Sequence, residues 1–369
     1  MSSKTQEKVK YSKSALTIMI KDAILWRSLP EKKVECVACE RRCRIPNNSH
    51  GFCYVRQNIE GKLKLIDYGV IAAMQIDPIE KKPFNHFMPG SYVFGVGTSS
   101  CNWGCLFCQN HNISKGREIT GVEIAPERVV ELAIENNTEC VAFTYNEPTI
   151  FIEYVLDVAR IAHQRGLKTL MVTNGYMTKE TVAQIRGLVD AVVVNIKGNG
   201  EQKFANKYEA VVSNEPIKEV ILEMRKAGIH VEMTDLIVPG VGDSLEACDA
   251  LTRWIHDSVG ADLPIQFTQF HPDYKMLDYP VTPFETLKKH YDIAKKNGLH
   301  YVYIGNVAGN QYENTYCHKC NAVVIERNGH YITGWKLSKE MKCKNCGTSI
   351  PVIGQPPKKF RYENIKVLY

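Results

Sequence analysis

The chain has 369 residues, 44% of them hydrophobic and 23% charged, with a formal net charge of +6 at pH 7. This composition is typical of a soluble globular protein, and no apolar run approaches the roughly 20 residues of a membrane-spanning helix, so we expect no membrane association. The sequence pI of about 8.5 and the interspersed charges argue against a nucleic-acid partner, because a dedicated binder has a clustered basic face.

The N-terminal segment 1–13 is polar and rich in lysine, and the apolar stretch Ala15–Trp26 is interrupted by Lys21 and Asp22. We expect an amphipathic helix here, because a signal peptide would have an unbroken apolar core. Thirteen cysteines without a secretion signal favour metal thiolates in a reducing compartment over disulfides. The expected location is therefore the cytoplasm.

The first cysteine set has the spacing C-x2-C-x3-C-x9-C and consists of Cys36, Cys39, Cys43 and Cys53. Four thiolates complete a tetrahedral zinc site. An iron-sulfur cluster is the alternative, but the spacing differs from the ferredoxin run C-x2-C-x2-C-x3-C, so the sequence favours zinc. Residues 1–90 are expected to form an N-terminal helix and a four-cysteine metal-binding module.

From Tyr92 to Asn306, short β-rich runs alternate with helical segments, which indicates parallel strands joined by crossover helices. The predicted strands are Tyr92–Gly97, Cys140–Tyr145, Lys168–Thr173, Ala191–Ile196, His230–Val238 and Ile265–Phe270, with His300–Ile304 as a candidate seventh. The predicted helices are Pro126–Asn136, Thr149–Arg165, Lys179–Leu188, Pro216–Ala227, Ser244–Ser258 and Pro283–Asn297. Six βα units fall short of the eight of a TIM barrel, so residues 91–310 are expected to form a partial (β/α)6 TIM-type barrel in an α/β protein.

The second cysteine set, Cys101, Cys105 and Cys108, follows the first predicted strand with the spacing C-x3-C-x2-C. Structural zinc sites and most iron-sulfur clusters take four protein ligands, so three thiols suggest a cluster with one iron open to a small molecule. In barrels the chemistry lies at the C-terminal ends of the strands. Polar or small residues that follow the other strands are therefore expected near this loop, namely Asn146, Glu147, Asn174, Lys197, Pro239, Gly240 and His271.

The third set has the spacing C-x2-C-x22-C-x2-C and consists of Cys317, Cys320, Cys343 and Cys346. Two β-like segments around an Asn328-Gly329 turn lie between its pairs, as in the hairpin of a zinc ribbon. Residues 311–369 are therefore expected to form a zinc-ribbon-like module. Reduced cysteines without a metal are the alternative. Cys140 and Cys248, which belong to no set, are expected to be buried thiols.

Together these patterns resemble the radical S-adenosylmethionine (radical SAM) superfamily. Within it the chain looks most similar to the pyruvate formate-lyase-activating-enzyme-like branch, and there to the radical SAM proteins of the AmmeMemoRadiSam system. Besides the cysteine-rich N-terminus, the resemblance rests on the segments Asp77–Pro83, Cys101–Asn110, Tyr145–Pro148, Thr173–Gly175, Leu236–Gly240, Phe270–Pro272 and Glu313–Cys317.

The resemblance implies that Cys101, Cys105 and Cys108 hold a [4Fe-4S] cluster whose fourth iron binds S-adenosylmethionine (SAM). An electron from a donor such as ferredoxin or flavodoxin would then cleave SAM, and the 5′-deoxyadenosyl radical would abstract hydrogen from a substrate. The implied contacts to SAM are Glu147 with its ammonium, Lys197 with its carboxylate, Phe107 with adenine, and Asn174 and His271 with ribose or carboxylate. The family's Gly-Gly-Glu is here Tyr145-Asn-Glu147, and its Asp-x-Lys is Asn195-Ile-Lys197.

Two other functions are compatible with the sequence. A glycyl-radical activase would abstract hydrogen from a backbone glycine of a partner protein, and partners from the AmmeMemoRadiSam system are also implied by the resemblance. A zinc-dependent nucleic-acid-binding protein would use the barrel as a scaffold for its two four-cysteine modules. The sequence identifies neither the substrate nor a catalytic side chain.

Overall fold

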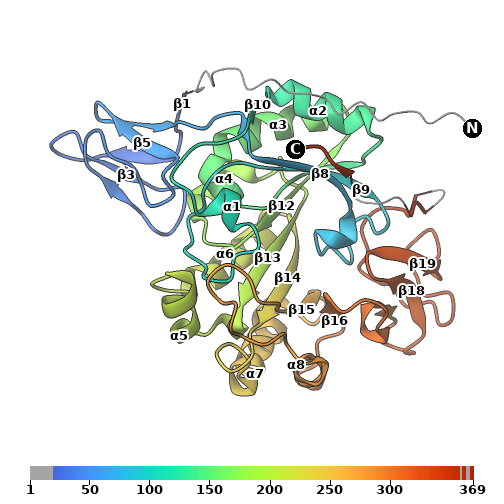
Figure 1. Cartoon of the computed structure of the whole chain (residues 1–369). Helices are drawn as coiled ribbons and strands as arrows, with labels where there is room; N and C mark the ends of the chain where they lie inside the picture. Colours follow the sequence, from blue (N-terminus) through green and yellow to red (C-terminus); the bar gives the residue numbers. More distant parts are fainter. Residues whose placement is uncertain (1–19, 358–359, 363–365) are drawn as a thin grey trace, which may run out of the picture.

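The computed structural model describes residues 20–357, 360–362 and 366–369. In these residues the largest element is a nine-stranded sheet with the order β16-β15-β14-β13-β12-β11-β9-β8-β20 (Figure 1). Seven of its strands are parallel and form an open barrel: β9 (Tyr92–Gly97), β11 (Cys140–Phe143), β12 (Lys168–Thr173), β13 (Ala191–Lys197), β14 (His230–Ile237), β15 (Ile265–Gln269) and β16 (Val302–Gly305). The expected α/β fold with a large parallel sheet is confirmed, and the candidate seventh strand is β16.

Crossover helices join successive parallel strands: α2 (Pro126–Glu135), α3 (Ile152–Gln164), α4 (Lys179–Ile185), α6 (Glu215–Lys226), α7 (Leu245–Trp254) and α8 (Phe284–Lys296). Local sequence sets where some of them begin. The hydroxyls of Thr178 and Ser244 accept the backbone N–H groups of Thr181 and Ala247, each at 3.1 Å, and so cap α4 and α7. None of the described helices is long and apolar enough to span a membrane.

Two antiparallel strands extend the barrel sheet beyond β9. Strand β8 (Ala73–Pro78) pairs with β9, and β20 (Lys366–Val367) pairs with β8. The boundary expected between residues 90 and 91 thus lies between two neighbouring strands of one sheet. Residues 73–78 contribute to the barrel sheet, although the sequence grouped them with the N-terminal module.

The interior of the barrel is apolar at one end and polar at the other. Alternate residues of each strand point inward. At the N-terminal ends of the strands, three apolar residues of the β8–β9 connection, Ile79, Phe84 and Phe87, pack against small and apolar strand residues. These strand residues are Val93, Cys140, Ala142, Leu170, Ala191 and Val193. The buried carboxylate of Glu232 holds this connection by accepting the backbone N–H groups of Asn85, His86 and Phe87 at 2.8 to 3.0 Å. The barrel is therefore filled with apolar side chains at this end.

Glycines in β9 allow the close approach of the chain after β11. A Cβ atom on Gly97 would lie 2.5 Å from the backbone oxygen of Thr144, and one on Gly95 would lie 2.8 Å from the Tyr145 hydroxyl. Such distances are too short for any side chain. The two glycines therefore place β11 and the residues after it beside the loop that begins at Cys101.

The N-terminal module consists of short strands instead of the expected helix. Two three-stranded sheets contain β1 (Lys21–Asp22), β6 (Lys62–Leu65) and β5 (Arg56–Ile59), and β2 (Trp26–Ser28), β3 (Val34–Cys36) and β4 (Arg44–Ile45). The prediction of a helix over Ala15–Trp26 is wrong for residues 20–26, and residues 15–19 lie outside the described part. Ala23 and Leu25 are buried whereas Asp22 and Ile24 are exposed, which is the two-residue period of a strand.

The C-terminal module contains a three-stranded antiparallel sheet of β17 (Thr315–Tyr316), β18 (Val323–Asn328) and β19 (Tyr331–Trp335). The hairpin expected between the two cysteine pairs is confirmed, with its turn at Gly329-His330, one residue later than expected. In Figure 1 this hairpin and the N-terminal strands lie on opposite sides of the barrel. Cys140 and Cys248 are buried in β11 and α7, as expected.

A buried carboxyl group on the outer face of β14 predicts how stability depends on pH. Asp235 is fully buried, and burial raises its pKa from 3.8 to about 7. Its contribution to stability is therefore complete below pH 4 and is lost as the pH rises through 7. We therefore expect the stability of Asp235→Asn relative to the parent to be about 2 to 3 kcal/mol greater at pH 8 than at pH 5.

Urea denaturation at the two pH values checks this prediction. Asp249→Asn in helix α7 is the matched control, because hydrogen bonding by Arg253 lowers the pKa of Asp249 and the same gain is not expected there. An Asp235→Asn variant that gains nothing at pH 8 would show that this carboxylate is not penalised by burial.

Candidate active site

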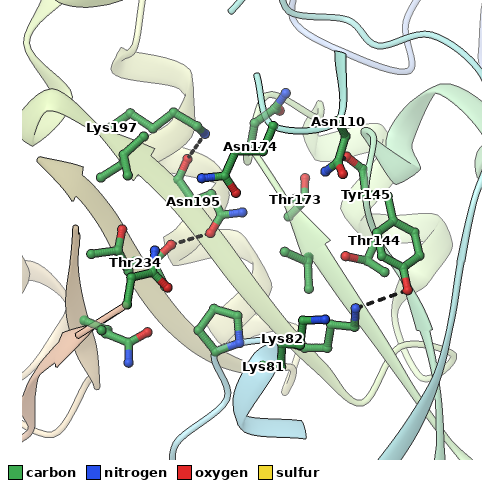
Figure 2. A pocket seen from close by; sticks show the side chains of 18 of the residues that line it. Lys81, Lys82, Asn110, Thr144, Tyr145, Thr173, Asn174, Asn195, Lys197 and Thr234 are labelled. Atoms are coloured by element: carbon green, nitrogen blue, oxygen red, sulfur yellow. Dashed lines mark hydrogen bonds between the residues drawn. The ribbon is translucent and has the colours of Figure 1, made fainter. Parts of the chain in front are cut away.

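The polar end of the barrel contains a cavity of about 550 Å³. Inward-facing residues from successive strand ends line it, among them Thr144, Asn174, Asn195, Lys197, Thr234, Gln266 and Thr268. Figure 2 shows Lys197 and Asn174 at one end of this space and Lys82 and Tyr145 at the other. The cavity lies at the C-terminal ends of the parallel strands, where the sequence placed the chemistry.

All three cysteines of the second set line this cavity. The backbone N–H of Trp103 donates to the Cys101 sulfur at 3.5 Å, and the hydroxyl of Ser114 lies 3.1 Å from the Cys108 sulfur. The side chain of Asn146 fixes the start of the loop by donating to the Ser100 backbone oxygen at 2.9 Å. Three thiols therefore point from one short loop towards the same open space.

The spacing of these thiols suits a cluster better than a single metal ion. Among the described residues, the sulfurs of Cys101, Cys105 and Cys108 do not form a group in which all ligand atoms lie within 4.8 Å of one another. Thiolates around one zinc ion would lie about 3.8 Å apart, given a Zn–S bond of about 2.3 Å. A cluster places iron and sulfide between its thiolates and so separates them more widely. The residues present fit a [4Fe-4S] group.

Two lysines give this end of the cavity a positive charge. Burial raises the pKa of the Cys101 and Cys105 thiols, and the ammonium of Lys115 opposes both shifts. Lys115 donates to the Trp103 backbone oxygen at 2.8 Å, and the Lys197 ammonium lies 5.0 Å from the centroid of the Trp103 ring. The two cations favour anionic groups here, both thiolates and an anionic ligand.

Glu147 is buried at the cavity wall, and donors of the protein occupy both of its oxygens. Oε1 accepts from the Thr149 hydroxyl at 2.5 Å and the Thr173 hydroxyl at 2.6 Å, and Oε2 accepts the Asn174 backbone N–H at 2.8 Å. Burial raises the pKa of Glu147, and these hydrogen bonds oppose the shift. The carboxyl group thus joins the ends of β11 and β12.

The other residues implied by the resemblance differ in where they lie. Phe107 is buried at the cavity wall with its ring centroid 5.7 Å from that of Phe204. Asn174 also lines the cavity and donates to the Asn102 side-chain oxygen at 2.8 Å. His271 is exposed and is not among the residues that line the cavity, but its Nε2 lies 2.7 Å from Nε2 of Gln109, which does line it.

A second charged group, to which the sequence analysis assigned no role, lines the opposite end of the cavity. The Lys82 ammonium donates to the Tyr145 hydroxyl at 3.3 Å (Figure 2). It also lies 2.7 Å from Asp77 Oδ2. Lys81 lies 2.9 Å from the same carboxylate. Arg327 of the C-terminal hairpin also lines this end. The sequence signal was the Asp77–Pro83 segment, which only the fold brings to the cavity.

The C-terminal cysteine set has the geometry of a single-ion site. The sulfurs of Cys317, Cys320, Cys343 and Cys346 all lie within 4.8 Å of one another. The Cys317–Cys346 distance is 3.6 Å and the Cys320–Cys343 distance is 3.8 Å. Both match the edge of about 3.8 Å expected for a zinc tetrahedron. These residues therefore fit one zinc ion.

Comparisons with known proteins agree with this site. Residues 96–255 match the sequence profile of the Radical SAM superfamily. The uncharacterized protein MJ0808 of Methanocaldococcus jannaschii is 40% identical over 342 residues, which are 90% of this chain and 100% of that protein. The chain belongs to the radical SAM superfamily. The region of this chain that matches the superfamily covers the cysteine loop and most of the barrel.

Two further similarities are more distant. A putative glycyl-radical enzyme activating enzyme of the same archaeon, MJ1227, is 26% identical over 218 residues, covering 56% of this chain and 84% of that protein. A radical SAM methyltransferase structure from Sphaerobacter thermophilus has a TM-score of 0.46 and 15% sequence identity, and the alignment covers 61% of this chain and 70% of that one.

Membership of the radical SAM superfamily supports an enzymatic function and implies a [4Fe-4S] cluster and SAM.

Proposed function

We propose that this protein is a radical SAM enzyme whose cluster is held by Cys101, Cys105 and Cys108. When bound, the cluster and SAM would supply a 5′-deoxyadenosyl radical that abstracts hydrogen from a substrate. The observation that carries the proposal is the set of three cavity-facing thiols, spaced too widely for one ion, at the exit of the first barrel strand.

The residues around the loop have distinct parts in this proposal. Lys197 and Lys115 would attract the carboxylate of SAM and stabilise the thiolates. Phe107 would pack against the adenine ring, and Asn174 would bind polar atoms of SAM. Since donors of the protein occupy both oxygens of Glu147, its main contribution would be to fix the strand ends, with contact to the SAM ammonium as a further interaction.

A SAM cleavage assay tests this proposal. The protein is purified and reconstituted with iron and sulfide without oxygen, then mixed with dithionite and SAM, and 5′-deoxyadenosine is measured by mass spectrometry. Formation above a blank that lacks protein is expected. A preparation with full iron content that forms none would overturn the proposal.

The opposite end of the cavity would bind an anionic group of the substrate. Lys81 and Lys82 share one carboxylate, that of Asp77, which leaves a positive charge in excess. Arg327 is buried nearby, and its Nε has no hydrogen-bond partner among the described residues. Burial raises the pKa of Glu80, which lines the same end, to about 7, so this carboxyl is only partly ionised near neutral pH.

The variant Lys82→Met is expected to separate substrate turnover from SAM cleavage. It removes the cation at this end but keeps the length of the side chain, and Asp77 remains paired with Lys81. We expect hydrogen transfer from substrate to fall about a hundredfold, with SAM cleavage without substrate almost unchanged.

The measurement uses deuterated cell extract as the source of substrate and records deuterium in 5′-deoxyadenosine. The matched control is Lys62→Met in strand β6 of the N-terminal module, which should alter neither reaction. Unchanged deuterium transfer in Lys82→Met would exclude a role for this cation in substrate binding.

Activation of a glycyl-radical enzyme is the second candidate function, and the similarity to MJ1227 favours it. The substrate would then be a glycine of a partner protein, and an electron paramagnetic resonance (EPR) signal of a glycyl radical in that partner would be decisive. The proposed partners are otherwise an electron donor such as ferredoxin or flavodoxin and the proteins of the AmmeMemoRadiSam system. We also propose that the C-terminal module binds zinc and that the protein is located in the reducing cytoplasm.

A further inference from the structure

A second pocket lies in the N-terminal module, and all four cysteines of the first set line it. Cys36 ends strand β3, Cys39 and Cys43 lie in the turn before β4, and Cys53 precedes β5. Cys36, Cys39 and Cys53 are buried. The module thus encloses four thiols in a protected pocket separate from the barrel cavity.

The three cysteine sets differ in how closely their sulfurs approach. All of these cysteines are described, and only the C-terminal set brings its sulfur atoms within 4.8 Å of one another. The N-terminal set shares the wider spacing of Cys101, Cys105 and Cys108. A single zinc ion cannot bridge such thiolates at a normal bond length, whereas a cluster with iron and sulfide between them can.

Two buried donors in this pocket have no acceptor. Arg56 is 2% exposed; its Nη2 lies 2.7 Å from Glu153 Oε2 and its Nε donates to the Ile150 backbone oxygen at 3.0 Å, but its Nη1 has no hydrogen-bond partner among the described residues. The Nδ2 atom of Asn102 is likewise buried without a partner in the described structure. Both residues line the pocket. Buried donors without acceptors are costly, so an anionic, sulfur-rich group in the pocket would satisfy them.

The pocket shares a wall with the barrel cavity. Asn102 lines the N-terminal pocket, whereas its neighbours in the chain, Cys101 and Trp103, line the cavity. Arg41 of the N-terminal module links this module to the barrel by donating to the backbone oxygens of Asn102 and Ala210. A group held in the N-terminal pocket would therefore lie directly behind the loop of the first cluster.

From these observations we propose that Cys36, Cys39, Cys43 and Cys53 bind a second iron-sulfur cluster, with Arg56 and Asn102 donating hydrogen bonds to it. The sequence favoured zinc because the cysteine spacing is not that of a ferredoxin. The pocket geometry favours the alternative, and this proposal is independent of the reaction at the barrel cavity.

Metal analysis of the variant Cys101→Ala/Cys105→Ala/Cys108→Ala tests the proposal, because this variant leaves the N-terminal module intact. The protein is reconstituted without oxygen in the presence of iron, sulfide and zinc together. We expect between about two and four iron atoms per chain, with matching acid-labile sulfide, about one zinc ion, and an EPR signal after reduction with dithionite. A variant with no iron, whether the pocket holds zinc or no metal, would overturn the proposal.

Two further measurements locate the iron. Adding Cys36→Ser and Cys53→Ser to the triple variant should remove the remaining iron, whereas adding Cys140→Ala and Cys248→Ala should leave it, since both of those thiols are isolated and buried. The unmodified protein should bind more than about four iron atoms per chain. If it binds four or fewer with full SAM cleavage activity, the second cluster is excluded and the proposed function is not.

Discussion

Replacing Cys101, Cys105 and Cys108 together with alanine is expected to lower the rate of 5′-deoxyadenosine formation at least about a thousandfold. The three thiols of the loop face the cavity and are the proposed cluster ligands, and no other cysteine of the described chain lines this cavity. Without them the cavity would lack the ligands of the cluster that is proposed to deliver an electron to SAM. The measurement is the anaerobic cleavage assay with dithionite as reductant.

The control for this triple variant is Cys140→Ala/Cys248→Ala, which removes two buried thiols that line neither cysteine pocket. It should retain activity close to that of the parent. Thermal denaturation of both variants shows whether the barrel is intact. A triple variant that is folded and forms 5′-deoxyadenosine at the parent rate would disprove the assignment of these cysteines.

The second large effect is expected at the ion pair between the N-terminal module and the barrel. Arg56 of strand β5 and Glu153 of helix α3 are 2% and 1% exposed at their side chains, and their charged atoms lie 2.7 Å apart. Glu153 also accepts the backbone N–H of Ile24 at 3.0 Å. Arg56→Met leaves a buried carboxylate without its cation and should destabilise the protein by about 3 to 5 kcal/mol.

The double variant Arg56→Met/Glu153→Met removes both charges and should recover much of this loss. Urea denaturation of the parent, both single variants and the double variant gives the coupling energy of the pair. The exposed pair Lys32–Glu60, at 2.9 Å, is the matched control and should show little coupling, because solvent screens both charges. If Arg56→Met and Arg56→Met/Glu153→Met are equally stable, the buried Glu153 carboxylate without its cation does not destabilise the protein.

The sequence predicted the barrel well because its strands are continuous apolar runs between helices with capping residues. The predicted strands Tyr92–Gly97 and Lys168–Thr173 agree with β9 and β12 to the residue. The predicted helix at Thr149–Arg165 begins as a 3-10 turn at Pro148–Phe151 before α3. Such patterns are local, so one sequence is enough to find them.

Features that depend on distant contacts escaped prediction. Strand β8 ends in a proline, and only its pairing with β9 identifies it as part of the barrel sheet. Lys82 and Lys115 give no periodic signal in the sequence, and each reaches the cavity because of where the fold places its backbone. The helix expected over Ala15–Trp26 failed within residues 20–26 because Lys21 and Asp22 pair with β6 instead.

The C-terminal module completes the wall of the barrel cavity. It supplies Arg327, Gly329 and His330 to that wall, and Arg327 donates to the Asn85 backbone oxygen at 2.7 Å. Because a ribosome makes the chain from its N-terminus and domains can begin to fold during synthesis, the seven parallel strands emerge before this wall does. A nascent chain therefore passes through a stage in which the cysteine loop already exists while that side of the cavity is still open.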